Sequence, residues 1–327
     1  MSACTKSNPN HDVLLFEHGS YANAIKHGDT YYYTMRTDGE RRITLWASNS
    51  LADIAQGQTK DVWPPKGADS IYHVWAPEIF FINNKWYIYF ECDDGNTDNH
   101  HIYVLENPSA DPMKGRFVLK DTLRTNREWN YGLHPTTFFC RGKQYLLWSG
   151  WPKRRNDVET QCIYIASMKN PWTVSSERTM VSEPIYEWER QWINYDGSRT
   201  PYPIYVNENP QATLSADGSK VIIYYMASGC WTTFSTLGMA WAYTSDNLLD
   251  SHSWHKSSEP LFIENLGDSI ARPCDISIVA SGDDAHPYLI YDSKTMHNHT
   301  LYTSVRMRTI SWGKDGLLDF GKWKAKK

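Results

Sequence analysis

The sequence contains no apolar run near the roughly 20 residues that a membrane-spanning helix needs. Its first residues, MSACTKSNPNHD, have no apolar stretch of the kind that marks a signal peptide. It also has no excess of positive charge, because the formal net charge is -4. These absences argue against a membrane or a nucleic acid as partner. They predict a cytoplasmic protein as the sequence is written, or a secreted one if a signal segment was removed.

Closely spaced cysteine pairs are absent as well. Six cysteines are scattered along the chain without a C-x-x-C motif: Cys4, Cys92, Cys140, Cys162, Cys230 and Cys274. Such spacing favours reduced thiols over a disulfide framework or a zinc site. We therefore expect free thiols, no bound metal and no cofactor.

Helical periodicity is scarce, whereas aromatic residues are abundant. The chain has 15 Trp and 21 Tyr, and 14% of its residues are aromatic. Most of these rings are expected to fill the core of β-sheets. Rings with a polar group also suit carbohydrate, which offers flat C–H faces for stacking and hydroxyls for hydrogen bonds. The composition therefore favours a β protein whose partner is an oligosaccharide or a polysaccharide.

One pattern of strand, tight turn and two further strands recurs five times. The units open with ANAIKHGDTYYYTM, APEIFFINNKWYIYFE, HPTTFFCRGKQYLLWSG, NPQATLSADGSKVIIYYMASG and RPCDISIVASGDDAHPYLIYDS. Gly, Asn and Asp in the turns supply the left-handed backbone positions that hairpins need. Four units begin with X-Pro, which suits the first residue of a strand.

Five such units predict an all-β fold, a five-bladed β-propeller that forms a single domain over residues 1–327. A β-sandwich is the second choice, since it would show more even spacing and no repeated three-strand unit. In a propeller the innermost strand of each blade begins near the central channel. The residues around each X-Pro, Glu208 among them, should therefore converge on one funnel. No heptad or interface stripe predicts the oligomeric state.

Several motifs carry a resemblance to a known family. They are WAPEIFFINNKWYIYF at residues 75–90, VNENP at 206–210, YLLWSGW, IASMKNPWTV and YEWER. With these segments in order along nearly the whole chain, the sequence resembles glycoside hydrolase family 43, in the branch of exo-acting α-L-arabinofuranosidases. The resemblance implies a catalytic five-bladed propeller that removes a terminal arabinofuranoside-like sugar from a plant-type glycan.

The resemblance also implies a site with substitutions. Members of the family invert the anomeric centre with two carboxylates, an acid that protonates the leaving oxygen and an aspartate that activates water. Glu208 matches the acid, and burial in the funnel should raise its pKa. Tyr21 stands at the position of the aspartate base, and His134 at that of a third aspartate. In the last unit Cys274 replaces a histidine near the channel axis, with Asp275 beside it.

Three hypotheses follow from these substitutions. Glu208 works with a non-standard base in an arabinofuranosidase-like hydrolase. Alternatively, Tyr21 and His134 serve a glycosidase or a lyase for a different sugar, with uronic sugars among the candidates. The third hypothesis is a propeller that binds glycans without cutting them. Seven further residues are assigned to substrate binding: Trp75, Glu78, Asp94, Trp151, Arg272, Cys274 and Arg306.

Overall fold

The computed structural model describes residues 12–64, 71–154, 159–193, 199–232, 235–261, 273–282, 285–297 and 300–320. Nearly all regular structure in these ranges is β-strand, and the only helical elements among them are four short 3-10 turns. These turns are η1 (Ile54–Gln56), η2 (Thr97–Asn99), η3 (Glu187–Glu189) and η4 (Ser251–Ser253). Within the same ranges no helix is long and apolar enough to cross a membrane.

The strands form five antiparallel units. The first contains β2 (Asn23–His27), β3 (Thr30–Thr37), β4 (Arg42–Ser48) and β5 (Gln58–Trp63). The second contains β6 (Tyr72–Ile82), β7 (Lys85–Asp93), β8 (His101–Asn107) and β9 (Val118–Leu123). The third contains β10 (Leu133–Cys140), β11 (Lys143–Gly150), β12 (Glu159–Asn170), β13 (Thr173–Val174) and β14 (Thr179–Ser182).

The remaining units complete the set. The fourth contains β15 (Arg190–Ile193), β16 (Arg199–Leu214), β17 (Lys220–Ala227), β18 (Thr236–Tyr243) and β19 (His255–Lys256). The fifth contains β20 (Pro273–Val279), β21 (Tyr288–His297), β22 (Thr300–Thr309) and β1 (Val13–Phe16). A short parallel pairing of β12 with β16 joins the third and fourth units, and β23 (Ser311–Trp312) pairs with β24 (Leu318–Asp319).

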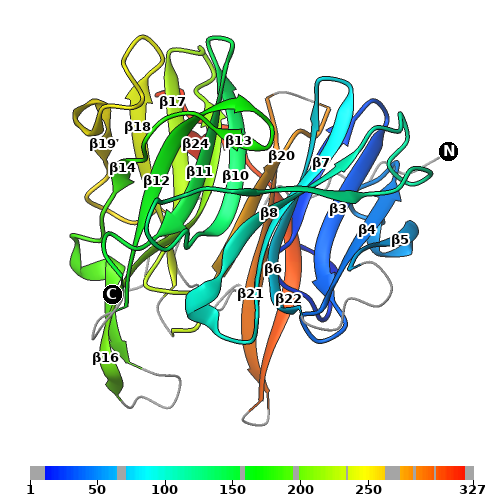
Figure 1. The fold of residues 1–327 in the computed structure, drawn as a ribbon, viewed down its shortest axis with the longest axis horizontal. Coiled ribbons are helices and arrows are strands. Elements are labelled where there is room, and N and C mark those ends of the chain that lie inside the picture. Colours follow the sequence, from blue (N-terminus) through cyan, green and yellow to red (C-terminus); the bar gives the residue numbers. More distant parts are fainter. Residues whose placement is uncertain are drawn as a thin grey trace, which may run out of the picture.

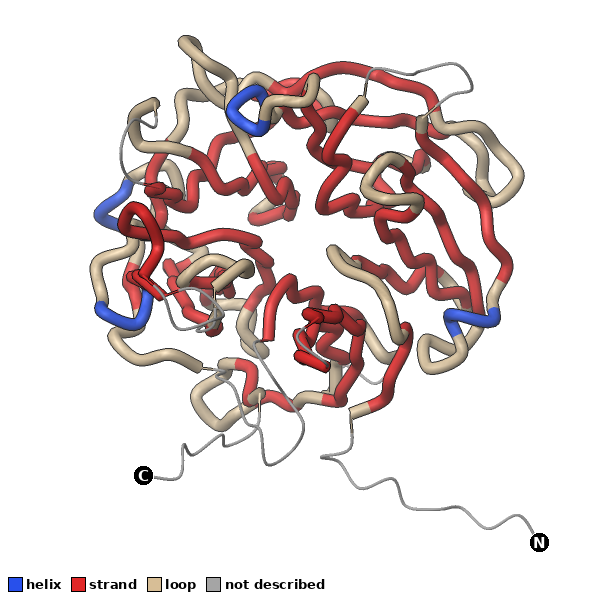
Figure 2. Tube along the Cα trace, turned by 90° about the horizontal axis from the view of Figure 1, so that it is seen from below, coloured by secondary structure: helices blue, strands red, loops and turns tan. Residues whose placement is uncertain are grey.

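The units are arranged around a common centre, which confirms the prediction of a five-bladed β-propeller (Figure 2). The innermost strands β2, β6, β10, β16 and β20 contact one another in this order, and β20 also contacts β2. In the side view of Figure 1 the first unit is blue, and strands β20, β21 and β22 of the last unit are orange. The last unit takes its outer strand from the start of the described chain, since Val13 of β1 pairs with Met307 of β22.

Apolar side chains between neighbouring blades form the core. Tyr32 of the first blade packs with Trp86 of the second, and Tyr89 of the second packs in one cluster with Trp148 of the third. Trp86 and Trp148 have no exposed surface. The alternating aromatic and β-branched residues of the second strands therefore supply the faces that hold the blades together, as expected for buried strands.

An irregularity of the backbone recurs within or just before every innermost strand. Five residues, one per blade, have a left-handed backbone: Tyr21 (φ 57°), Ala76 (φ 40°), His134 (φ 50°), Asn209 (φ 48°) and Asp275 (φ 43°). In the last four blades the strand register shifts at this residue, which is the signature of a β-bulge. Because bulges redirect side chains, these five structurally equivalent positions, which we call the bulge positions, aim residues at the channel.

Candidate active site

Glu208 directly precedes the bulge position of the fourth blade, and its side chain is held from the neighbouring loop. The carboxylate is 2% exposed, and Oε1 accepts a hydrogen bond of 2.7 Å from the backbone N–H of Cys230. The next residue, Asn209, accepts a hydrogen bond of 3.0 Å from the N–H of Ile276 and so ties β16 to β20. Glu208 is therefore a buried carboxylate with a defined orientation.

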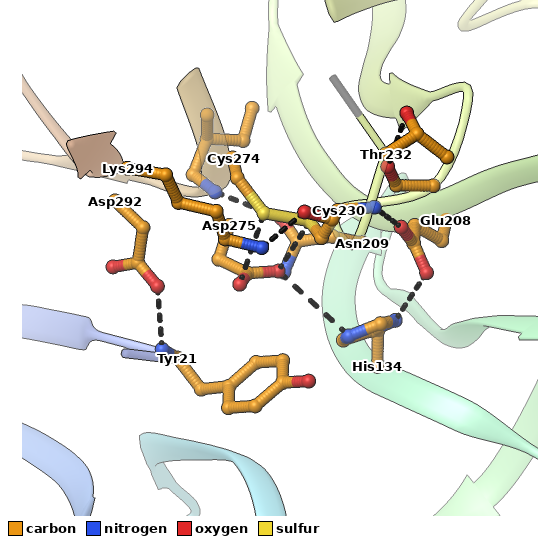
Figure 3. Close-up of a disulfide and its surroundings, with 12 residues drawn as sticks. Tyr21, His134, Glu208, Asn209, Cys230, Thr232, Cys274, Asp275, Asp292 and Lys294 are labelled. Atoms are coloured by element: carbon orange, nitrogen blue, oxygen red, sulfur yellow. Dashed lines mark hydrogen bonds and ion pairs between the residues drawn. A yellow bond between two sulfur atoms is a disulfide. The ribbon is translucent and has the colours of Figure 1, made fainter. Parts of the chain in front are cut away.

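His134 lies between Glu208 and Asp275 (Figure 3). Its Nδ1 is 4.0 Å from Oε2 of Glu208, and its Nε2 is 3.8 Å from Oδ1 of Asp275. The imidazole is buried, and neither ring nitrogen has a hydrogen-bond partner among the described residues. Burial, with the charge of His100 as a smaller cause, lowers the pKa of His134 to about 3. The ring is therefore neutral at pH 7, and its two unpaired nitrogens leave room for ligand hydroxyls or water.

Two aspartates of the fifth blade lie beside this histidine. Burial raises the pKa of Asp275 to about 6, against the opposing charge of Lys294. Burial and then the charge of Asp275 raise the pKa of Asp292 well above its usual range. Oδ2 of Asp292 accepts a hydrogen bond of 3.0 Å from the backbone N–H of Tyr21. The two carboxyl groups therefore titrate together, and each raises the pKa of its neighbour when it is ionised.

Tyr21 and Trp75 form an aromatic wall next to His134. The rings of Tyr21 and Trp75 are stacked at 6.1 Å, and Tyr21 lies 5.6 Å from the ring of His134. Trp75 stacks on His100 at 4.3 Å, and the guanidinium of Arg36 lies 4.6 Å from the centre of the Tyr21 ring. Burial and the charge of Asp275 raise the pKa of Tyr21 well above its usual range, so its phenol stays neutral.

Two residues assigned to substrate binding lie in or beside the lining of this site. Trp75 is partly exposed, and its indole N–H donates to Oε2 of Glu40 at 2.9 Å. Trp151 is buried behind it, stacked on Tyr131 at 3.7 Å. Trp75 can therefore touch a ligand directly, whereas Trp151 contributes to the packing that supports the wall.

Three other assigned residues do not join the cluster. Arg306 lies on β22, two strands away from β20, opposite Leu14 and Tyr291, because the third strand of a blade is remote from the channel. Asp94 is exposed and accepts hydrogen bonds from Asn99 within its own loop. Arg272 lies outside the described residues.

Glu78 lies two residues beyond the bulge position of the second blade and reaches across to the fourth. Its Oε1 accepts a hydrogen bond of 2.5 Å from Nε2 of Gln211. Burial raises the pKa of Glu78 to about 8, although hydrogen bonds from Thr136 and Gln211 oppose the shift. Glu78 therefore acts as a neutral link between blades at pH 7.

Substitution Glu78→Gln should flatten the dependence of stability on pH. The raised pKa means that protonated Glu78 stabilises the fold below about pH 4.5 and that this contribution is lost as pH rises through about 8. We expect the wild type to lose on the order of 2–4 kcal/mol more unfolding free energy than Glu78→Gln between pH 5 and 9. Urea unfolding at both pH values measures this, and equal losses in the two proteins would refute the role.

The cysteine prediction is wrong for one pair. Cys230 and Cys274 form a disulfide, with Cα atoms 5.7 Å apart, while Cys92, Cys140 and Cys162 are free. Sequence spacing missed the pair because 44 residues separate its members, which meet only when the fourth and fifth blades pack. The Asp275 carboxylate lies near both sulfurs, but the disulfide leaves no thiolate for a metal there.

The structure also corrects the placement of Cys274. We expected it near the channel axis, with Asp275 as its neighbour. The bulge position of the fifth blade is Asp275, so Asp275 is the counterpart of Tyr21 and His134, and Cys274 is the counterpart of Glu208. An alignment of the units on the Pro of each X-Pro does not reveal this equivalence. Pro273 precedes the bulge position of its blade, whereas Pro77, Pro135 and Pro210 follow theirs.

Four charged residues of the site were missed by the sequence analysis. They are Arg36 on β3, Glu91 on β7, and Asp292 and Lys294 on β21. Glu91 and Asp292 have no exposed surface, and burial raises the pKa of Glu91 well above its usual range. The sequence contains a signal for three of them. The segments FECD (90–93) and YDSK (291–294) place charged residues in strands that are otherwise apolar, and charged residues buried in such strands often belong to functional sites.

Comparisons with known proteins agree with this architecture. The sequence model of the family described as "Glycosyl hydrolases family 43" matches residues 20–318. An extracellular exo-α-(1→5)-L-arabinofuranosidase of Streptomyces avermitilis is 32% identical over 94% of this chain and 62% of its own length. An α-L-arabinofuranosidase 43 of Humicola insolens is 29% identical over 91% of this chain and 60% of its own length.

A solved structure is similar over its whole length. The crystal structure of an α-L-arabinofuranosidase from Lactobacillus brevis superposes with a TM-score of 0.80 at 24% identity, covering 96% of both chains. At this identity the likeness shows the fold alone. The present chain spans about three fifths of the length of the two curated relatives above.

Proposed function

This chain belongs to glycoside hydrolase family 43, and from that premise we propose that it hydrolyses the bond to a terminal arabinofuranoside-like sugar of a plant-type glycan. The observation that carries the proposal is Glu208, a buried carboxylate in the VNENP segment, oriented by the N–H of Cys230 and facing His134. Two relatives that carry the name arabinofuranosidase, at 32% and 29% identity, support the choice of sugar.

In this proposal each group near the channel has a task. Glu208 protonates the leaving oxygen as the glycosidic bond breaks. The neutral His134 hydrogen-bonds sugar hydroxyls through its two unpaired nitrogens. Tyr21 and Trp75 form the wall against which a sugar face packs.

The lyase and tyrosine-nucleophile hypotheses receive less support. Abstraction of a proton by His134 is disfavoured by its low pKa of about 3. Tyr21 would have to ionise despite its raised pKa. Arg306, considered as a partner for a uronic carboxylate, belongs to the third strand of its blade. A hydrolase that uses carboxyl groups requires neither proton abstraction by His134 nor ionisation of Tyr21.

We further propose that the propeller is one catalytic domain and that it works in an oxidising compartment. The Cys230–Cys274 disulfide supports the second point, since cytosolic thiols are kept reduced. The word "extracellular" in the name of the Streptomyces avermitilis relative agrees with it. Both observations favour the secreted alternative over the cytoplasmic one.

Product analysis on defined sugars tests the proposal. The protein is incubated with aryl α-L-arabinofuranosides, α-1,5-arabino-oligosaccharides, xylosides and pectic oligosaccharides that contain uronate. We expect arabinose to be released from the chain ends of the arabino-oligosaccharides, seen by chromatography. A product that absorbs near about 235 nm would mean elimination at a uronate and would sink the hydrolase proposal. Binding without turnover of any sugar would favour a propeller that only recognises glycans.

A further inference from the structure

We propose that Asp275 is the general base that activates the attacking water, in place of the aspartate that the family carries where this chain has Tyr21. The inference rests on the proposed hydrolase function and deepens it by naming the residue that completes the reaction. The family's base position, held by Tyr21 here, belongs to the first blade, whereas Asp275 belongs to the fifth. In this proposal the base therefore comes from a different blade of the same fold, and the acid Glu208 stays on the fourth.

The equivalence of the bulge positions carries this inference. Tyr21, His134 and Asp275 occupy the same backbone position in the first, third and fifth blades, each with a left-handed φ between 43° and 57°. In these three blades the position brings the side chains together, since His134 lies 3.8 Å from Asp275 and its ring lies 5.6 Å from that of Tyr21. Of its five occupants, Tyr21, Ala76, His134, Asn209 and Asp275, only Asp275 carries a carboxylate.

The geometry around His134 sets the two carboxyl groups apart. Oε2 of Glu208 and Oδ1 of Asp275 approach opposite nitrogens of one imidazole, at 4.0 and 3.8 Å (Figure 3). The two carboxyl groups therefore flank one imidazole as separate groups, which is the arrangement that an inverting mechanism needs for its acid and its base. A sugar bound against the His134 edge would have one carboxyl group on each side.

Charged groups of the same blade surround Asp275. Burial raises the pKa of Asp275 to about 6, and Lys294, the main positive charge that acts on it, favours the ionised form that a base needs. The Nζ of Lys294 also donates to the carbonyl of Cys230. The titratable and charged groups that face Asp275 are Asp292, Lys294, His134, Tyr21, Glu208, Arg36 and Glu91.

The step balances without any further reactant. Asp275 takes a proton from water while the water oxygen forms a bond to the anomeric carbon. The bond from that carbon to the leaving oxygen breaks on the opposite side, and Glu208 gives its proton to the leaving oxygen. The products are the free sugar, with inverted configuration, and the shortened glycan. Asp275 then loses its proton to solvent, and Glu208 regains one.

The test compares Asp275→Asn with Glu208→Gln on two substrates, one with an alcohol and one with an activated aryl leaving group. We expect Asp275→Asn to lower kcat/KM by about 10²–10⁴-fold on both, because water must be activated whatever the leaving group. Glu208→Gln should be impaired mainly with the alcohol. The exposed Asp246, in a turn after β18, offers a matched Asp246→Asn control that should retain wild-type activity.

Chemical rescue separates a base from a residue that only holds the site together. Azide needs no deprotonation, so it should restore turnover of the aryl substrate by Asp275→Asn and give a glycosyl azide of inverted configuration, identified by NMR. The wild-type profile of kcat/KM should also fall below about pH 6, since Asp275 must be ionised. This profile serves as the readout if Asp275→Asn does not fold.

The outcomes separate the two proposals. Activity of Asp275→Asn within tenfold of wild type, while Glu208→Gln loses activity, would overturn the role of Asp275 and leave the hydrolase intact. Loss of activity in Asp275→Asn without azide rescue, or a wild-type profile that stays flat down to pH 4, would also overturn it. No turnover by the wild type on any glycoside would remove the hydrolase proposal and, with it, the base.

Discussion

Glu208→Gln is expected to lower kcat/KM on arabino-oligosaccharides by about 10²–10⁴-fold. An alcohol leaving group needs a proton as the bond breaks, and the glutamine amide cannot supply one. The substitution is nearly isosteric, and its amide oxygen can still accept the hydrogen bond that Glu208 receives from the N–H of Cys230. The loss should therefore appear in the chemical step, with little change in the folded structure.

The activity lost in Glu208→Gln should depend on the leaving group of the substrate. An activated phenolate departs without protonation, so Glu208→Gln should retain most of its turnover on a dinitrophenyl arabinofuranoside. Initial rates on the two substrates, with Glu259→Gln as an exposed control, measure the difference. Equal losses on both substrates would show that Glu208 supports the site in another way. Full activity on the oligosaccharide would show that the acid is another group.

The double substitution Cys230→Ser/Cys274→Ser is expected to lower the free energy of unfolding by about 2–4 kcal/mol. The disulfide spans 44 residues, and breaking it restores the freedom of that long loop in the unfolded chain. It also joins the loop that holds Glu208 to the strand that carries Asp275. We therefore expect a lower kcat in this variant together with the lower stability.

Reducing agent provides the matched control for the disulfide. Dithiothreitol should shift the urea midpoint of the wild type towards that of the double variant and leave the variant unchanged. Mass spectrometry of an unreduced digest should detect the peptides of Cys230 and Cys274 joined together. Separate peptides, or a wild-type midpoint that does not respond to reduction, would refute the disulfide.

Much of the fold was predictable because its signals are local. Gly28 and Gly142 allow the left-handed turns of two hairpins, and the strands that follow carry unbroken runs of buried residues. Asn209-Pro210 and its three X-Pro relatives marked the innermost strands. The pattern of three strands per unit did not reveal the outer strands β5, β9, β14 and β19, nor β1, which completes the last blade and lies far from it in sequence.

The site was predictable only in part. Glu208 could be found because a family motif surrounds it, and Trp75 because it belongs to another. The pKa of His134 and that of Asp275 depend on burial and on neighbours from other blades, which no short segment reveals. The position of Arg306 could not be predicted either. It was assigned to substrate binding, but it lies on β22, away from the innermost strand of its blade.

Short segments of the sequence account for the repeated strands, their turns and the position of Glu208, because strand and turn preferences act over a few residues. Which groups meet depends instead on how the blades pack together. The N–H of Tyr21 reaches Asp292 across 271 residues, and Cys230 reaches Cys274 across 44. Closing such separations depends on packing of the blades around the channel. The same packing removes water and thereby sets the protonation states that the proposed reaction needs.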